Sequence, residues 1–275
     1  MKKIIESFSS IENSRYSWFL IVFLSLINLS SLEAFSQKSV ILDNYYNCEF
    51  DKLTSRPFHY LWNDSTSNGF SEFGKLFSKH GAKIGTLTSS PNIENLKVAD
   101  VYIIVDPDNK EESPSPNFMN ASAANEIANW VKNGGVLLML ANDNENCDLD
   151  NLNILACMFG MKFNKDILHS ENSIPGKPRN FDSCASKNLP NHQLFLGVEK
   201  IFLKGISSIN CTQPAQAILE EENKIIIAEA TYGKGKIIAV GDPWLYNEYI
   251  GHTSLPTDFD NHKVAENLVK LLINK

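Results

Sequence analysis

Acidic side chains follow four apolar runs in this 275-residue chain. The runs 40–42, 101–105, 136–141 and 237–241 are followed by Asp43, Asp106, Asn142–Asp143 and Asp242, respectively. Paired carboxyl groups can serve as general acid and base in glycosidic bond hydrolysis, and clustered ones can hold Ca²⁺ through oxygen ligands. The alternative is structural, because acidic residues after strands often cap helices and turns.

The segment 241–249, with the sequence GDPWLYNEY, is the strongest local feature. Trp244 offers a flat apolar face, while Asp242, Asn247 and Glu248 offer directional hydrogen bonds. Sugars need both, because a sugar ring has an apolar face and a rim of hydroxyl groups. The alternative is that Trp244 packs in the core and Asp242 caps the following turn.

A second aromatic and polar segment covers residues 56–64 and contains His59, Tyr60 and Trp62. His59 is a candidate general base, although a single histidine among aromatic residues is more often structural. Together with the strand-end residues, this segment completes the predicted site. The predicted ligand-binding residues are Asp43, Asn44, His59, Tyr60, Trp62, Asp106, Asn142, Asp143, Asp242, Trp244, Asn247 and Glu248, and the catalytic candidates are Asp242, Glu248 and His59.

Several other chemistries lack their sequence signals. The Asn142–Glu145 turn has no Ser or Cys where a nucleophile elbow would place one, and the glycines at 233–235 join two strands instead of opening a helix around a phosphate. The cysteine spacings fit no zinc site. We therefore predict no cofactor and no metal. The net charge of −7 argues against a nucleic acid partner.

The apolar runs also indicate which elements position the site. Unbroken β-branched runs are typical of parallel strands buried on both faces, whose carboxyl ends share one edge of a sheet. Helices are predicted over Phe70–His80, Ser122–Lys132 and Leu149–Phe159, and a last helix is predicted to be capped by Asp260–Asn261. Residues 224–240 predict a hairpin. The fold class is therefore α/β, with a mostly parallel central sheet and a C-terminal hairpin.

The first 36 residues have the layout of a secretory signal peptide. Lys2, Lys3 and Arg15 precede an apolar stretch, and Ala34–Ser36 offers a cleavage site before Gln37. We expect a periplasmic or secreted domain over residues 37–275, without a stable membrane span after cleavage; an uncleaved membrane anchor is the alternative. Export permits disulfides among the five cysteines, and their odd number leaves at least one thiol unpaired or paired between chains. Cys157, in an apolar helical segment, is expected to be buried.

The residues 134–139, 232–236 and 241–243, together with Asn247 and the helix 261–272, resemble a class I glutamine amidotransferase-like domain of the DUF4350 type. The chain is similar to the domain appended to some bacterial unsaturated rhamnogalacturonyl hydrolases of the GH88/GH105 type. This resemblance implies a flavodoxin-like three-layer fold and a setting in polysaccharide breakdown outside the cytoplasm. It does not imply amidotransfer, because Asn142–Asp143 occupies the place of the catalytic cysteine and no His-x-Glu pair follows.

Three functional hypotheses follow. In the first, an exported domain binds pectin-derived sugars at the carboxyl ends of the strands, beside a polysaccharide-degrading enzyme as partner. In the second, a hydrolase uses a carboxylate pair, or His59 with a carboxylate, at the same edge. In the third, the aromatic segment 56–64 contacts a protein partner, and the domain is a scaffold.

Overall fold

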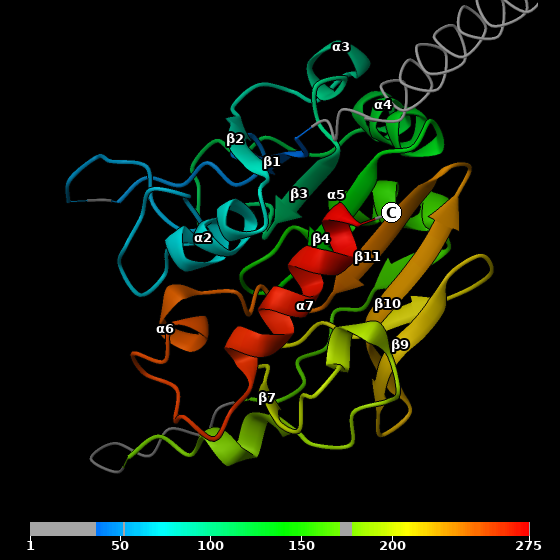
Figure 1. Ribbon diagram of the computed structural model, residues 1–275. Coiled ribbons are helices and arrows are strands. Elements are labelled where there is room, and N and C mark those ends of the chain that lie inside the picture. The colour runs from blue at the N-terminus through cyan, green and yellow to red at the C-terminus, as the bar shows by residue number, and fades with distance from the viewer. Residues whose placement is uncertain (1–36, 52, 171–177, 275) are drawn as a thin grey trace, which may run out of the picture. The chain divides into compact units, whose positions relative to one another are not determined.

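A nine-stranded sheet forms the centre of the computed structural model, which describes residues 37–51, 53–170 and 178–274 (Figure 1). Five neighbouring strands are parallel, in the spatial order β2 (Lys83–Leu87), β1 (Ser39–Asp43), β3 (Val101–Val105), β4 (Val136–Leu140) and β11 (Gly235–Val240). Every residue of β3 and β4 is buried, as unbroken apolar strands require. The parallel strands predicted from the apolar runs are confirmed.

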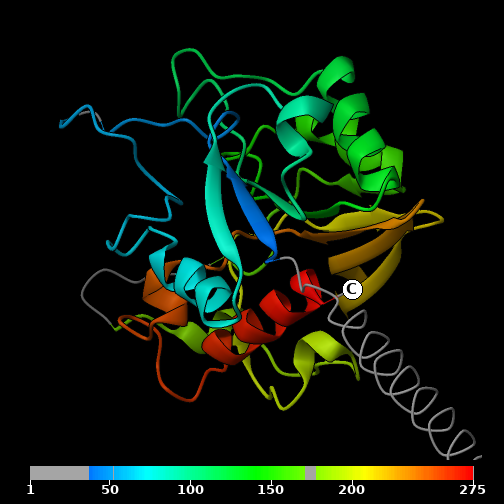
Figure 2. The ribbon, with the colours of Figure 1, turned by 45° about the horizontal axis from the view of Figure 1, so that its top comes forward.

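Helices cover both faces of this sheet (Figure 2). One face carries α2 (Ser71–Lys79), α6 (Asn247–Ile250) and α7 (Asn261–Ile273), and the other carries α3 (Ile93–Leu96), α4 (Ala121–Lys132) and α5 (Leu149–Ala156). Side chains of β3 alternate between two cores: Val101 and Ile103 pack toward α2 and α7, and Tyr102 packs toward α4. The result is the predicted flavodoxin-like three-layer sandwich.

The far half of the sheet is antiparallel. Here β10 (Lys224–Tyr232) pairs with β11, β8 (Ile209–Cys211) and β9 (Gln216–Glu221), and β5 (Met161–Phe163) pairs with β8. The β10–β11 pair confirms the predicted hairpin. The remaining elements are a small sheet of β6 (Ala185–Ser186) and β7 (Ile201–Phe202) and the 3₁₀ helices η1 (Cys157–Phe159), η2 (Phe181–Cys184) and η3 (Gln193–Phe195).

Two local predictions are wrong. Cys157 is exposed, because α5 buries Leu152, Leu155 and Ala156 and places position 157 on the opposite side. The Asp260 side chain does not cap α7; its Oδ2 accepts hydrogen bonds from the backbone N–H groups of Glu199 (2.8 Å) and Lys200 (3.3 Å). Asp260 therefore anchors the segment before β7 and not the helix that follows it.

The described residues from Lys38 onward belong to one compact unit. The predicted signal peptide, residues 1–36, lies outside the described residues. None of the helices in the described part of the chain is both long enough and apolar enough to cross a membrane.

Candidate functional site

A polar cavity of about 380 Å³ opens beyond the carboxyl ends of β3, β4 and β11, and we call it the rim cavity. Its lining residues come from the segments that follow these strands and from three loops, 59–60, 167–170 and 204–205. They are His59, Tyr60, Asp106, Glu112, Asn142, Asp143, Asn146, Ile167, Ser170, Lys204, Gly205, Asp242 and Tyr246. Six of the twelve predicted ligand-binding residues are thus brought together: His59, Tyr60, Asp106, Asn142, Asp143 and Asp242.

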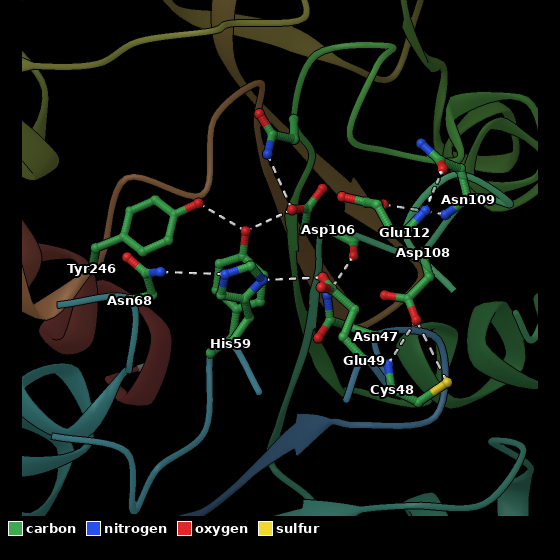
Figure 3. Close-up of polar contacts among 12 residues, drawn as sticks. Asn47, Cys48, Glu49, His59, Asn68, Asp106, Asp108, Asn109, Glu112 and Tyr246 are labelled. Atoms are coloured by element: carbon green, nitrogen blue, oxygen red, sulfur yellow. Dashed lines mark hydrogen bonds and ion pairs between the residues drawn. The ribbon is translucent and has the colours of Figure 1, made fainter. Parts of the chain in front are cut away.

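Asp106 is held at the centre of a hydrogen-bond network (Figure 3). Its Oδ2 accepts from the Tyr60 hydroxyl (2.5 Å) and from Asn142 Nδ2 (3.0 Å), and the Tyr60 hydroxyl also contacts that of Tyr246 (2.7 Å). Asp106 Oδ1 is buried without a hydrogen-bond partner. Burial raises the pKa of this carboxyl to about 7, although both hydrogen bonds lower it. Near neutral pH, Asp106 can therefore either donate or accept a proton.

Asp242 is a second buried carboxyl on the same wall. It is 2% exposed, and its Oδ2 accepts a hydrogen bond from the backbone N–H of Lys204 (2.8 Å). Burial raises its pKa to about 7, and the charge of Asp106 raises it further, while the Lys204 backbone and side chain lower it. Two carboxyl groups that change protonation near pH 7 thus face one cavity.

The backbone of the rim cavity is strained. His59, Tyr60 and Asp106 have φ values of +60°, +52° and +42°, a region that residues with a Cβ rarely adopt. Strained residues of this kind gather at functional sites, where the surrounding contacts hold them in place. In Asp106 this conformation lets the carboxylate turn back toward Tyr60 and Asn142.

Both ring nitrogens of His59 are engaged. Nε2 lies 3.3 Å from Asn68 Nδ2, which can only donate, so Nε2 accepts and the proton resides on Nδ1. Nδ1 in turn lies 3.1 Å from Glu49 Oε1. His59 could act as a general base only after breaking one of these contacts, so the structure favours a positioning role for it.

Asp43 and Trp244 are turned away from the rim cavity, which corrects the prediction of one shared edge. Asp43 is fully buried and accepts hydrogen bonds from the backbone N–H groups of Tyr45 (3.1 Å) and Tyr46 (2.7 Å) and from the Tyr102 hydroxyl. The turn after β1 thus folds its carboxylate inward. Trp244 is 2% exposed and packs in the core on the α2 and α7 side.

Asn44 and Trp62 line a different, mainly apolar cavity of about 650 Å³ beside β2. Trp62 lies there because its Nε1 donates to the backbone oxygen of Gly85 (2.9 Å) and its ring packs against Phe73. The prediction that these two residues join the strand-end acids is therefore wrong.

Asn247 and Glu248 stabilise the fold instead of lining the rim cavity. Asn247 is 6% exposed; its Oδ1 accepts from the backbone N–H of Glu72 (2.9 Å), and its Nδ2 donates to the backbone oxygens of Asp64 (2.9 Å) and Thr66 (2.8 Å). Glu248 accepts from the Ser254 hydroxyl (2.9 Å). Asn247 thus joins the loop 64–66 to the start of α2.

We expect Asn247→Ala to lower the free energy of unfolding by about 2–4 kcal/mol, because it leaves three backbone groups without their partner. Urea unfolding at neutral pH measures this. Asn133→Ala, at an exposed position, is the control and should change stability by less than about 0.5 kcal/mol. A loss under about 1 kcal/mol for Asn247→Ala would show that these hydrogen bonds do not hold the loop.

Sequence reasoning missed Glu112 and Lys204, which come from loops without a motif, and Tyr246, which lies inside the segment 241–249 but was not selected. It also missed a group of three acids, Glu49, Asp108 and Glu112, which we call the carboxylate cluster. One ligand oxygen from each of them lies within 4.8 Å of the others. Burial raises the pKa of Asp108 to about 6 and that of Glu112 to about 9. In the described part of the chain, these are the residues whose donor atoms could hold a metal ion.

The comparisons with known proteins concern the fold. No protein-family model and no curated protein matches the chain. The mmIFT52 N-terminal domain is similar with a TM-score of 0.64 and 16% identity, over 86% of this chain and 98% of that one. The cytoplasmic protein STM3548 from Salmonella typhimurium is similar with a TM-score of 0.56 and 18% identity, over 85% and 98%. The cytoplasmic protein STM1381 from Salmonella typhimurium LT2 is similar with a TM-score of 0.55 and 13% identity, over 86% of this chain and 99% of that one. At such identities the likeness shows a shared fold and not a shared function.

Proposed function

We propose that the rim cavity binds a neutral sugar and that this chain is an exported, carbohydrate-associated domain. The observation that carries the proposal is Asp106, which lines the cavity and whose Oδ1 is a buried acceptor without a hydrogen-bond partner. Burying an unsatisfied polar atom costs about 1–3 kcal/mol, and a ligand hydroxyl that donates to it would remove that cost.

The other groups of the cavity suit a polyhydroxylated ligand. Each sugar hydroxyl donates one hydrogen bond and accepts others, and the wall offers acceptors in Asp143 and Asp242 and donors in Asn142 and Lys204. Tyr246, which is half-buried, adds an aromatic face for the apolar side of a ring. The volume of about 380 Å³ is in the lower part of the range of small-molecule sites, about 300–1,000 Å³.

The charge of the wall favours a neutral sugar over a uronate. Four carboxyl groups line the cavity, from Asp106, Glu112, Asp143 and Asp242, against one ammonium group, from Lys204. Those of the four carboxyl groups that are ionised would repel a ligand carboxylate. Among pectin-derived sugars, rhamnose and galactose thus fit better than galacturonate.

The pectic setting and the enzyme partner rest on the resemblance to the amidotransferase-like domain of the DUF4350 type, and export rests on the signal peptide predicted for residues 1–36. These remain predictions. They agree with a sugar ligand, because a polysaccharide-degrading enzyme outside the cytoplasm releases such sugars.

Isothermal titration of the protein with rhamnose, galactose, galacturonate and pectic oligosaccharides tests the proposal. We expect a neutral sugar to bind and Asp242→Asn to weaken it at least about tenfold, or about 1.4 kcal/mol, because a charge-assisted hydrogen bond is lost. Asp150→Asn, at an exposed position outside the rim cavity, is the matched control. Failure of every sugar to bind, or equal affinity in Asp242→Asn, would refute the assignment.

Hydrolysis is the second candidate function, because Asp106 and Asp242 both face the cavity and both have a pKa near 7. A carboxylic acid that stays protonated at neutral pH can protonate a leaving glycosidic oxygen while an ionised partner acts as base or nucleophile. Mass spectrometry of the oligosaccharide mixtures should then show new product masses that disappear with Asp242→Asn. Unchanged masses would reject hydrolysis for that panel and leave binding.

A further inference from the structure

We propose that the carboxylate cluster of Glu49, Asp108 and Glu112 is a binding site for Ca²⁺. This inference goes beyond the proposed sugar site and holds whether or not the rim cavity binds a sugar. It rests on the spacing of the three acids, on a buried oxygen without a partner, and on the rigidity of the two loops that carry them.

The spacing suits one hard cation. Oxygen ligands lie about 2.3–2.6 Å from Ca²⁺, so two ligands of one ion are at most about 5.2 Å apart. Three protein carboxylates favour Ca²⁺ over Mg²⁺, because Mg²⁺ keeps several waters and is usually held by one or two carboxylates. The three ligand atoms of the cluster lie within 4.8 Å of one another. They can therefore share one Ca²⁺ without a large movement of the chain.

Asp108 supplies the second, independent observation. Its side chain is fully buried, and its Oδ1 has no hydrogen-bond partner. In Figure 3 this oxygen points away from Cys48, toward the side where Glu49 lies. A buried ionised oxygen without a donor is costly, and a cation at this position would compensate for it.

Each acid of the cluster is held through one of its two oxygens. Asp108 Oδ2 accepts from the backbone N–H of Cys48 (3.0 Å). Glu112 Oε2 accepts from the backbone N–H of Asn109 (3.3 Å), and Glu49 Oε1 contacts the His59 ring (3.1 Å). These contacts orient the three carboxylates from outside and leave one further oxygen of each for a ligand. In the described part of the chain, the cluster forms no ion pair with a lysine or arginine; its contact with His59 is the hydrogen bond to Glu49.

The two loops that carry the cluster are tied to each other. The backbone N–H of Asp108 donates to the Tyr46 oxygen (2.9 Å), and Asn47 Nδ2 donates to the Asp106 oxygen (2.8 Å). The segment after β1 therefore keeps its place against the segment after β3. A second cavity, of about 390 Å³, is lined by Glu49, Glu111 and Glu112, so two of the three acids of the cluster border it.

Isothermal titration with CaCl₂ alone, on chelator-treated protein purified from the full-length sequence, tests the site. We expect one Ca²⁺ per chain, with a dissociation constant no weaker than the roughly 10⁻⁴–10⁻³ M of extracellular modules, and a thermal midpoint that CaCl₂ raises. Glu112→Gln should weaken binding at least about tenfold, because it removes one ligand charge. Glu145→Gln, which removes the same charge at an exposed position that does not line this cavity, should leave binding unchanged.

Glu49→Gln provides a second variant if Glu112→Gln proves unstable, and it should weaken Ca²⁺ binding in the same way. The proposal is overturned if wild-type protein shows neither binding heat nor a thermal shift up to about 10 mM CaCl₂. Equal losses in Glu145→Gln and Glu112→Gln would overturn it as well, because they would indicate a diffuse charge effect. MgCl₂ that binds as tightly as CaCl₂ would contradict the assignment to Ca²⁺. Since no sugar is present, none of these outcomes depends on the rim cavity.

Discussion

Raising the pH from about 4 to about 7 is expected to destabilise the folded protein, through Asp106 and Asp242. In the unfolded chain these carboxyls ionise with an ordinary pKa of 3.8, whereas burial raises the folded pKa of each to about 7. Between these two values the folded state binds more protons than the unfolded state, so stability falls as the pH rises. The contribution is fully present below about pH 4 and is lost above about pH 7. A shift of about three pKa units corresponds to about 4 kcal/mol per carboxyl at about 1.4 kcal/mol per unit.

The variant Asp242→Asn isolates this effect. Its side chain is neutral at every pH, and its oxygen can still accept the hydrogen bond from the Lys204 backbone. We expect equal stability of wild type and variant near pH 4 and a variant more stable by up to about 4 kcal/mol at pH 8. Urea unfolding over a pH series measures the difference.

Asp143→Asn is the matched control, because Asp143 lines the same cavity but is half-buried and accepts hydrogen bonds from Asn146 Nδ2 (3.0 Å). This variant separates the effect of removing a carboxylate from the cavity from the effect of removing a buried one. A stability difference for Asp242→Asn that does not change with pH would show that this carboxyl has the same pKa in the folded and unfolded states. The expected gain also bears on the sugar titration, since a variant that is more stable above pH 7 cannot lose its ligand through unfolding.

The placement of Asp106 and Asp242 at one edge could be predicted, because a strand buried on both faces leaves an unbroken apolar run in the sequence. The direction of each carboxylate could not. Asp43 and Asp106 both end parallel strands, yet Asp43 folds inward onto the backbone of Tyr45 and Tyr46, while the positive φ of Asp106 turns its carboxylate to Tyr60. The backbone conformation of the acidic residue at the end of each strand therefore decides whether its carboxylate faces the cavity.

The loop residues of the carboxylate cluster also could not be predicted to lie together. Glu49 and Glu112 are 63 positions apart, and neither lies in a recognisable motif; the loops after β1 and β3 bring them together only because β1 and β3 are neighbours in the sheet. The order of the strands in the sheet is thus the information needed to predict this cluster from the sequence. The exposure of Cys157, in contrast, could have been predicted. The buried positions 152, 155, 156 and 159 follow a helical period that excludes position 157, and this pattern is present in the sequence.

Gly241→Ala is expected to destabilise the protein by about 3 kcal/mol or more and to disrupt the rim cavity. A Cβ at position 241 would lie 2.0 Å from the backbone oxygen of Ser207 and 2.7 Å from Ile206 Cγ2. A movement of either segment would break hydrogen bonds, because the Ser207 N–H donates to the Gly241 oxygen (3.0 Å) and the Gly241 N–H donates to the Ile226 oxygen (3.0 Å). Relief would have to shift the backbone that positions Asp242.

Gly85→Ala is the control for Gly241→Ala. Its Cβ would lie 2.9 Å from Ile41 Cδ1, the far end of a flexible side chain that can rotate away, so we expect a loss below about 1 kcal/mol. Urea unfolding measures both variants, and sugar titration shows whether the site survives. If Gly241→Ala stays within about 1 kcal/mol of wild type, the segment 206–207 can move away from β11. In that case the glycine before Asp242 is not what brings the 204–207 loop against the carboxyl end of the strand, and the position of Asp242 must depend on its hydrogen bond from Lys204 instead.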